Sequence, residues 1–298
     1  MDKKVSIIIT TYGREYDIIK RSINSVINQT YKNIELIIVN DNGNNIQFNK
    51  DIENNIKKLK KIIEIKYIKN KENTGAQHSR NEGISNASGE LIAFLDDDDE
   101  WLPLKIEKQV EQFCSEDIGL VYTDGYTITE ETLTKNNYHS NYEFKEKTSF
   151  IEMLCSDVIG TTTTGMVSKK AFETVGNFDI DQPARQDYEM WLRILTKFKC
   201  VGINEKLFNH YIHKGEQISK NVDKSIVGYL NIYHKYYYYY KKHPKAKYDF
   251  YKKMILCYKR KKDYMNVIKY IFMKFAILPL ATIEYLKQKQ RKESVDNE

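Results

Sequence analysis

A run of five carboxylates directly follows an apolar segment and could hold a metal ion. Residues 91–95 read LIAFL, and residues 96–100 read DDDDE. Adjacent carboxylates repel one another, so such a run persists only if it is solvated or if a cation lies among its members. Asp96 and Asp98 could bind Mg²⁺ or Mn²⁺ and leave the remaining coordination positions to phosphate oxygens of a ligand. A solvated acidic turn is the alternative interpretation.

A calcium-binding loop does not explain the acidic run. If Asp96 took the first ligand position of such a loop, Glu107 would take the twelfth. The sharp turn at the sixth position requires glycine, but Trp101 stands there. The run is therefore not an EF-hand loop.

Regular elements must position these residues. Four near-continuous apolar segments are typical of buried strands, and apolar residues at helical spacing follow the first and the third of them. The expected strands are residues 5–10, 34–40, 62–68 and 91–95, and the expected helices are residues 15–28 and 74–87. Strands that alternate with helices predict an α/β fold whose parallel sheet is covered by helices on both faces.

Three of the expected strands end in polar residues. These residues are Thr10 with Thr11, Asn40 with Asp41, and the acidic run itself. In open α/β sheets, ligands bind beyond the carboxyl ends of the strands. We therefore expect a single crevice to collect all three groups.

The rest of the chain is expected to mix helices and strands. Pro103, followed by Ile106, Val110 and Phe113 at helical spacing, predicts a helix. The polar stretch 125–147 is expected to form a long irregular loop. The other predicted elements are strands at 119–124, 161–168 and 200–208 and helices at 148–156, 169–175 and 186–198.

The two parts of the chain carry opposite charge. Residues 206–298 contain 21 Lys and Arg against 8 Asp and Glu, a net charge of +13, although the whole chain carries only +6. A basic helical region suits nucleic acid, an anionic membrane surface or a solvated helical face. Aromatic residues are not interleaved with basic ones as in a single-strand groove, so nucleic acid is not expected as a partner.

Cysteine usage favours a reducing compartment. The four cysteines are far apart in the sequence and form no C-x-x-C pair, so neither a zinc site nor a disulfide framework is expected. The apolar run VSIII near the N-terminus is too short for the core of a signal peptide. These features predict a cytoplasmic protein.

Five segments together resemble glycosyltransferase family 2, a large bacterial group with a GT-A nucleotide-sugar-binding fold. The segments are VSIIITTYGRE (5–15), ELIIVNDNG (35–43), NTGAQHSRNEGISNASGELIAFLDDDDEW (73–101), VGNFD (175–179) and RQDYEMWLRI (185–194). They span about two thirds of the chain, from residue 5 to residue 194, and occur in the order of the family. The resemblance implies a Rossmann-like, mostly parallel sheet flanked by helices, with a C-terminal helical appendage.

The resemblance also implies roles for the residues at the strand ends. Thr11 matches the position that lines the base and ribose, and Asp41 matches the carboxylate that accepts from the uracil N–H. Arg80 matches an arginine that contacts the nucleotide. Asp96 and Asp98 match the D-x-D motif, in which the first carboxylate lies near the ribose and metal and the second binds Mn²⁺ or Mg²⁺ directly. The two aspartates beside them, Asp97 and Asp99, would then be spectators or would support the ligating residues.

The catalytic base is expected near residue 187. Asp187 matches the family's catalytic carboxylate, but Gln186 stands where the family has glutamate, which leaves Glu189 as an alternative base. On a helix these two carboxylates point about 200° apart, so only one can face the acceptor. His210 and His213 follow the strand expected at 200–208, and His213 is the preferred candidate for a metal or phosphate contact.

The reaction implied by the resemblance is an inverting sugar transfer. A hexosyl or N-acetylhexosaminyl group would pass from a UDP-sugar to a saccharide or lipid-linked saccharide, in the synthesis of a surface polysaccharide such as a capsule or lipopolysaccharide. A sugar nucleotidyltransferase is one alternative, but it would need a glycine-rich phosphate loop that TTYGRE does not supply. A non-catalytic nucleotide- or glycan-binding module is the other alternative.

The C-terminal region has two interpretations. Residues 263–286 are apolar but contain Lys269, Lys274 and Pro279, so a membrane-spanning helix is not expected. Basic residues flank the segment on both sides, which is typical of an interfacial helix at the inner face of the plasma membrane. Alternatively, the segment packs on the catalytic domain or on a second copy in a homo-oligomer. The predicted domains are 1–205, with a nucleotide-sugar part to 124 and an acceptor part from 125, and 206–298.

Overall fold

The computed structural model describes residues 2–139, 144–213 and 221–295 of the chain. These residues fall into two compact units, each formed by three stretches of sequence. The first unit comprises Met1–Thr148, Val158–Ile180 and Met190–Lys214, and the second comprises Ser149–Asp157, Asp181–Glu189 and Gly215–Glu298. The boundary predicted at residue 205 falls inside a strand of the first unit, and two short segments expected in the catalytic domain belong to the second unit.

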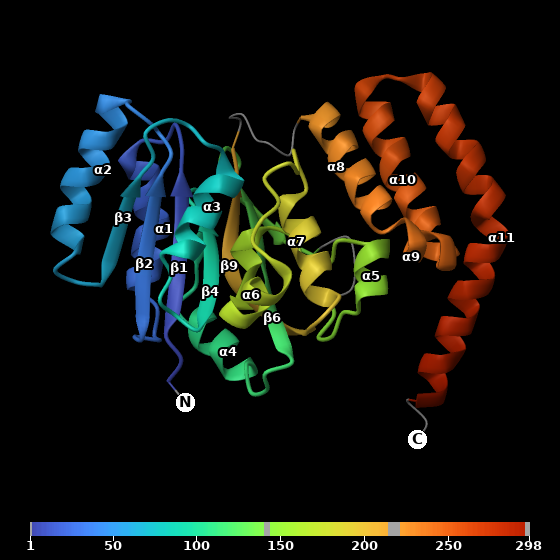
Figure 1. The fold of residues 1–298 in the computed structure, drawn as a ribbon, viewed down its shortest axis with the longest axis horizontal. Helices are drawn as coiled ribbons and strands as arrows, with labels where there is room; N and C mark the ends of the chain where they lie inside the picture. Colours follow the sequence, from blue (N-terminus) through green and yellow to red (C-terminus); the bar gives the residue numbers. More distant parts are fainter. Residues whose placement is uncertain (1, 140–143, 214–220, 296–298) are drawn as a thin grey trace. The chain divides into compact units, whose positions relative to one another are not determined.

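The first unit is built on one sheet, coloured from blue to orange along the chain in Figure 1. Its strand order is β3-β2-β1-β4-β8-β6-β9-β5, and β7 pairs with β6. The strands are β1 (Val5–Thr11), β2 (Ile34–Asn40), β3 (Ile65–Lys69), β4 (Leu91–Asp96), β5 (Glu100–Trp101), β6 (Ile118–Thr129), β7 (Thr134–Asn137), β8 (Gly165–Ser168) and β9 (Lys199–Ile212).

The predicted parallel arrangement is confirmed for the four N-terminal strands. β1 pairs in parallel with both β2 and β4, and β2 pairs in parallel with β3. The side chains of β2 are buried at every position, which explains their continuous apolar sequence. β8 is antiparallel to β4 and to β6, so the sheet as a whole is mixed.

Helices of the first unit connect these strands. They are α1 (Tyr16–Ile27), α2 (Ile46–Leu59), α3 (Ala76–Ser85), α4 (Lys105–Gln112) and α6 (Lys169–Val175). The sequence interpretation missed α2, because Ile52 and Ile56 are its buried hydrophobic residues and the rest of the helix is mostly polar. The side chain of Asn45 caps this helix by accepting from the N–H of Phe48.

Three predictions for the middle of the chain were wrong. The stretch 125–147 is not irregular throughout, because β6 continues to Thr129 and pairs with β7 in a hairpin. The side chains of β7 are all exposed, so no apolar alternation marked the strand. The strand expected at 161–168 is a 3₁₀ turn, η1 (Thr162–Thr164), followed by the four residues of β8. β9 ends at Ile212 rather than 208, which places His210 inside the strand.

The second unit is helical in the residues that the structure describes. It contains α5 (Phe150–Cys155), the first turn of α7 (Gln186–Leu195), α8 (Val222–Lys235), α9 (Tyr237–Lys242), α10 (Pro244–Lys261) and α11 (Tyr264–Val295). α10 and α11 lie side by side and are joined at Lys262, which has a left-handed backbone conformation (Figure 1). Aromatic rings fill the interior of this unit, and the rings of Tyr233 and Phe250 stack 4.3 Å apart.

Candidate functional site

The carboxyl edge of the parallel strands brings four predicted site residues together. Thr10 of β1 lies in register with Asp96 of β4. The N–H of Asp41, just after β2, donates to the carbonyl oxygen of Thr11 at 2.9 Å. Arg80 of α3 donates from Nη2 to Oδ1 of Asp96 at 3.1 Å. The three polar groups therefore lie at one edge of the sheet, beyond β1, β2 and β4, and the crevice expected there stays a prediction.

Asp41 organises the loop that leads into α3. Its buried carboxylate accepts hydrogen bonds from Asn70 Nδ2 at 2.7 Å, from the N–H and hydroxyl of Thr74 at 2.9 Å each, and from the N–H of Gly75 at 2.8 Å. Gly75 has a φ of 89° and caps the helix, a conformation that favours glycine. Asp41 thus fixes the start of the helix that carries Arg80, and its contact with a uracil base stays a prediction.

Asp96 is held by two donors from different elements. Besides Arg80, the hydroxyl of Thr162 donates to Asp96 Oδ1 at 3.2 Å. The guanidinium of Arg80 also lies 5.6 Å from the centre of the Phe178 ring, within the range of a cation–π contact. The side chain of Asp96 remains 31% exposed, so it is accessible to a ligand while it is paired.

Asp98 meets the histidine predicted as its partner and an arginine that was not predicted. Asp98 Oδ2 lies 2.7 Å from His213 Nε2 and 2.8 Å from Arg14 Nη2. Arg14 Nη2 lies 2.9 Å from the same nitrogen of His213. The guanidinium therefore stands directly beside both predicted metal ligands. The position of Arg14 after a strand that ends in polar residues was the signal that could have identified it.

Asp97 and Asp99, which were expected to be spectators or supporting groups, are both buried and paired with neighbouring side chains. Burial and the neighbouring Asp98 raise the pKa of Asp97 to about 7, although Arg14 opposes the shift. Asp99 accepts hydrogen bonds from the Thr163 hydroxyl at 2.7 Å and from the N–H of Tyr211 at 3.1 Å. Asp99 therefore anchors β9 to the acidic run, which agrees with the supporting role that was one of the two expectations for this residue.

His210 pairs with Asp99 rather than with the predicted metal ligands. Its Nδ1 lies 3.0 Å from Asp99 Oδ1. Burial opposes a charge on the ring, but the adjacent Asp99 outweighs burial and raises the pKa of His210 to about 9. A protonated His210, together with Arg14 and Arg80, offsets much of the charge of the acidic run.

The donor set of the acidic run fits a cation with few protein ligands. Among the described residues, no group of three or more His, Cys, Asp and Glu side chains converges as a metal cluster. Asp98 Oδ2 and His213 Nε2 converge at 2.7 Å, a direct hydrogen-bond distance, so the two side chains would separate slightly to hold a cation between them. Such a pair matches the way in which Mg²⁺ or Mn²⁺ is held when ligand phosphates supply the other oxygens.

The second unit distinguishes the two candidate bases on α7. Glu189 is buried, and its Oε1 lies 2.6 Å from Nζ of Lys235 on α8. Asp187 is half-buried in the first turn, where its Oδ1 accepts from the N–H of Tyr188 at 2.8 Å. The residue before the helix, Arg185, has a φ of 61°. Glu189 is thus committed to an interior ion pair, and the assignment of Asp187 as the base stays a prediction.

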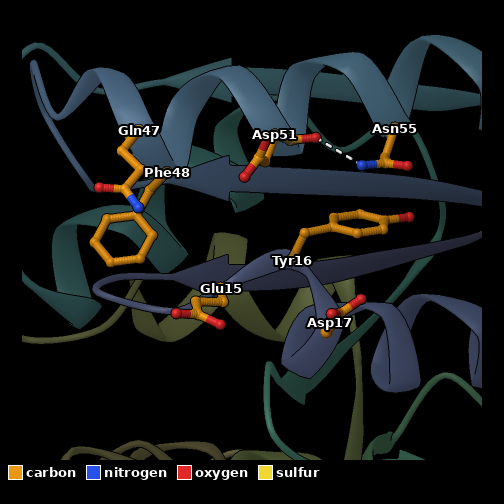
Figure 2. Close-up of a pocket in the computed structure, with 7 residues that line it drawn as sticks. All are labelled: Glu15, Tyr16, Asp17, Gln47, Phe48, Asp51 and Asn55. Atoms are coloured by element: carbon orange, nitrogen blue, oxygen red, sulfur yellow. Dashed lines mark hydrogen bonds between the residues drawn. The ribbon is translucent and has the colours of Figure 1, made fainter.

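A separate groove lies between the starts of α1 and α2 (Figure 2). It has a volume of about 370 Å³. Its lining residues are Glu15, Tyr16, Asp17, Gln47, Phe48, Asp51 and Asn55. None of the predicted donor-binding residues lines it, and its carboxylates would repel an anionic nucleotide-sugar. The donor site is therefore assigned to the polar strand edge instead.

The mixed sheet and its polar edge are those of a GT-A type nucleotide-sugar-binding domain. The model of the family described as Glycosyl transferase family 2 matches residues 6–176. The chain belongs to this family and is a glycosyltransferase. Family membership supports a glycosyltransferase over the nucleotidyltransferase and the non-catalytic module that the sequence had left open.

Three curated relatives are similar over most of their length. A glycosyltransferase of Methanocaldococcus jannaschii is 34% identical over 230 residues, which cover 75% of this chain and 76% of the relative. The UDP-Glc:alpha-D-GlcNAc-diphosphoundecaprenol beta-1,3-glucosyltransferase WfaP of Escherichia coli is 33% identical over 76% of this chain and 84% of its own. The putative teichuronic acid biosynthesis glycosyltransferase TuaG of Bacillus subtilis is 31% identical over 68% and 77%, respectively.

A solved structure shares the fold. The crystal structure of residues 1–349 of TarS from S. aureus, in complex with UDP-GlcNAc, superimposes with a TM-score of 0.62 and covers 89% of each chain. The sequence identity is 14%, so this likeness shows the fold alone.

Proposed function

We propose that this glycosyltransferase moves a hexosyl or N-acetylhexosaminyl group from a UDP-sugar to a saccharide or lipid-linked saccharide, with inversion, in the synthesis of a bacterial surface polysaccharide. The observation that carries the proposal is the polar strand edge at which Thr11, Asp41, Arg80 and Asp96 lie. The names of WfaP and TuaG, and the UDP-GlcNAc bound to TarS, support the choice of donor and acceptor class.

In the proposed reaction, the chain supplies a base for the acceptor hydroxyl and groups that hold the leaving group. Asp187 accepts the proton of an acceptor hydroxyl, whose oxygen forms a bond to the anomeric carbon of the donor sugar. The bond from that carbon to the diphosphate oxygen breaks, and UDP leaves from the opposite face, which inverts the configuration. Thr11 and Asp41 would hold the nucleoside, and Arg80 would contact the nucleotide.

A divalent cation completes the proposed donor site. Asp98 and His213 would hold Mn²⁺ or Mg²⁺, with Asp96 close by, because their side chains already converge. The cation would neutralise charge that develops on the diphosphate leaving group. Arg14 occupies the same side-chain atoms, so it would have to move away when the cation binds.

The proposed place of action is the cytoplasmic face of the plasma membrane. The cysteines of the chain are free thiols, which suits a reducing compartment. A lipid-linked acceptor, such as the one in the name of WfaP, would be met at a membrane surface.

The catalytic assignment is tested with Asp187→Asn. A screen of nucleotide-sugars, read as slow donor hydrolysis and as thermal stabilisation with Mn²⁺ present, first identifies the donor. Asp187→Asn should then lose turnover but bind this donor as tightly as the wild type, whereas the exposed Asp181→Asn in the same unit should keep both. Full turnover by Asp187→Asn would refute the assignment of the base.

The metal assignment is tested by calorimetry of UDP binding. Asp98→Ala and chelation with EDTA should each weaken UDP binding, because both remove the proposed cation from the diphosphate. If UDP affinity is unchanged by both treatments, the role proposed for Asp98 is wrong.

A further inference from the structure

The long C-terminal helix exposes an apolar surface that the described residues leave uncovered. By length and composition, Tyr264–Lys287 of α11 could cross a membrane, yet only 17% of its most apolar stretch is buried. The helix continues through Pro279. Its exposed large apolar side chains are Tyr264, Met265, Ile268, Phe272, Met273, Phe275, Leu278, Leu280, Ile283, Tyr285 and Leu286. Exposed apolar surface of this extent marks a site of interaction.

One stripe of α11 packs within the second unit. Val267, Tyr270 and Ala281 are buried, and they recur at the three- and four-residue spacing of one helix face. The ring of Tyr270 stacks on Tyr258 of α10 at 5.6 Å. The carboxylate of Glu284, on the same stripe, accepts from the N–H of Lys245 at the start of α10 at 2.8 Å. These contacts hold α11 along α10.

The opposite side of α11 is apolar along its length. Six large side chains recur there at helical spacing, and each is at least 51% exposed. These residues, named here the outer face, are Met265, Ile268, Phe272, Phe275, Ile283 and Leu286. With 3.6 residues per turn, the outer face points away from the stripe that packs on α10.

We propose that the outer face of α11 lies in the interface of an anionic membrane and anchors the enzyme there. The basic run Lys259–Lys262 precedes the helix, and exposed Lys269 and Lys287 follow. This arrangement of apolar and basic residues is typical of interfacial helices on anionic lipids. A second copy of the chain is a less favourable partner, because it would bring these like charges together. The proposal concerns membrane binding and does not depend on the transfer reaction.

The helix lies along the membrane rather than across it. Lys274 and Glu284 lie on or beside the packed stripe, and α10 behind it exposes Lys252, Lys259 and Arg260. A spanning α11 would either lose its contacts with α10 or carry these charges into the hydrocarbon, where charged groups are strongly disfavoured. If only the outer face enters the membrane interface, its apolar side chains leave water and the packed stripe keeps its contacts with α10.

Vesicle co-sedimentation of the full-length protein tests the proposal. The wild type should sediment with vesicles of phosphatidylcholine and phosphatidylglycerol, and less with phosphatidylcholine alone or at high salt. The variant Phe272→Ser/Phe275→Ser should lose at least tenfold in binding to the mixed vesicles. The matched control, Leu256→Ser/Tyr238→Ser, removes two equally exposed side chains of the same unit outside α11 and should bind as the wild type does.

Three results would overturn the proposal. The first is equal binding by both double variants. The second is resistance of the vesicle-bound wild type to extraction by alkaline carbonate, which would show a spanning helix. The third is a concentration-dependent dimer in analytical ultracentrifugation without lipid that Phe272→Ser/Phe275→Ser abolishes, which would show that a second copy covers the outer face. Donor hydrolysis by the same variants is measured without vesicles. This assay reports on the proposed reaction alone, so a failure of the membrane proposal can be told apart from a failure of the proposed function.

Discussion

Removal of the Arg14 guanidinium should tighten the binding of Mn²⁺ in the absence of donor. Arg14 Nη2 lies 2.8 Å from Asp98 Oδ2 and 2.9 Å from His213 Nε2, which are the atoms proposed to bind the cation. A cation cannot share these atoms with a guanidinium at hydrogen-bond distance, since both are positive and both need the same lone pairs. The wild type must therefore break the Arg14 contacts before Mn²⁺ binds, whereas Arg14→Met need not.

The size of the effect follows from the contacts that are lost. A hydrogen bond with a charged partner contributes about 1.5–3 kcal/mol. The side chains of Arg14 and Asp98 are 23% and 16% exposed, so water screens the pair in part and the lower end of this range applies. Because 1.4 kcal/mol corresponds to a factor of ten, the Kd for Mn²⁺ should fall by roughly 10-fold in Arg14→Met.

Electron paramagnetic resonance of Mn²⁺ measures this without catalysis, because free and bound Mn²⁺ give different signals. Arg21→Met is the matched control: its Nη2 donates to the main-chain oxygen of Asp98 at 2.6 Å and leaves the carboxylate alone. The control should bind Mn²⁺ as the wild type does. Unchanged or weaker binding by Arg14→Met would refute competition, and equal tightening in both variants would show a general charge effect instead.

Three further predictions concern stability and are measured by thermal or denaturant unfolding. Glu35 is fully buried, and burial opposes its charge, but a lysine of β3 and hydrogen bonds from serines lower its pKa to about 2. The stability that Glu35 contributes is therefore present above its unfolded pKa near 4.5 and is lost as the pH falls through 2. Glu35→Gln should flatten this dependence of the unfolding free energy on acid pH. Lys235→Met leaves the buried carboxylate of Glu189 without its ion-pair partner and should lower the free energy of unfolding by about 3 kcal/mol. The same substitution should lower it by less when it is made in a protein that already carries Glu189→Met. Gly83→Ala would place a Cβ 2.6 Å from Ile8 Cγ2 and should cost about 1–3 kcal/mol and displace α3; an unchanged midpoint would contradict the packing.

The elements that the sequence predicted well are those whose burial is uniform. β1, β2 and β4 appear where their apolar runs stand, because a strand covered on both faces needs apolar residues at most of its positions. α2 and β7 escaped detection for the opposite reason. One buries few apolar residues and the other buries none of its side chains, so neither carries the periodicity that reveals an element.

The sequence by itself determined where β1, β2 and β4 lie along the chain, the polar residues at their carboxyl ends and the family. Only the tertiary structure decided how the charges are matched. Arg14 and His213 are 199 residues apart and yet share one contact at Asp98, and Lys235 reaches Glu189 across 46 residues. Helical periodicity showed that Asp187 and Glu189 point in different directions, but it did not show which of them faces the interior. Electrostatic interactions depend on distance in space and on burial, and neither quantity is written in the spacing of residues along the chain.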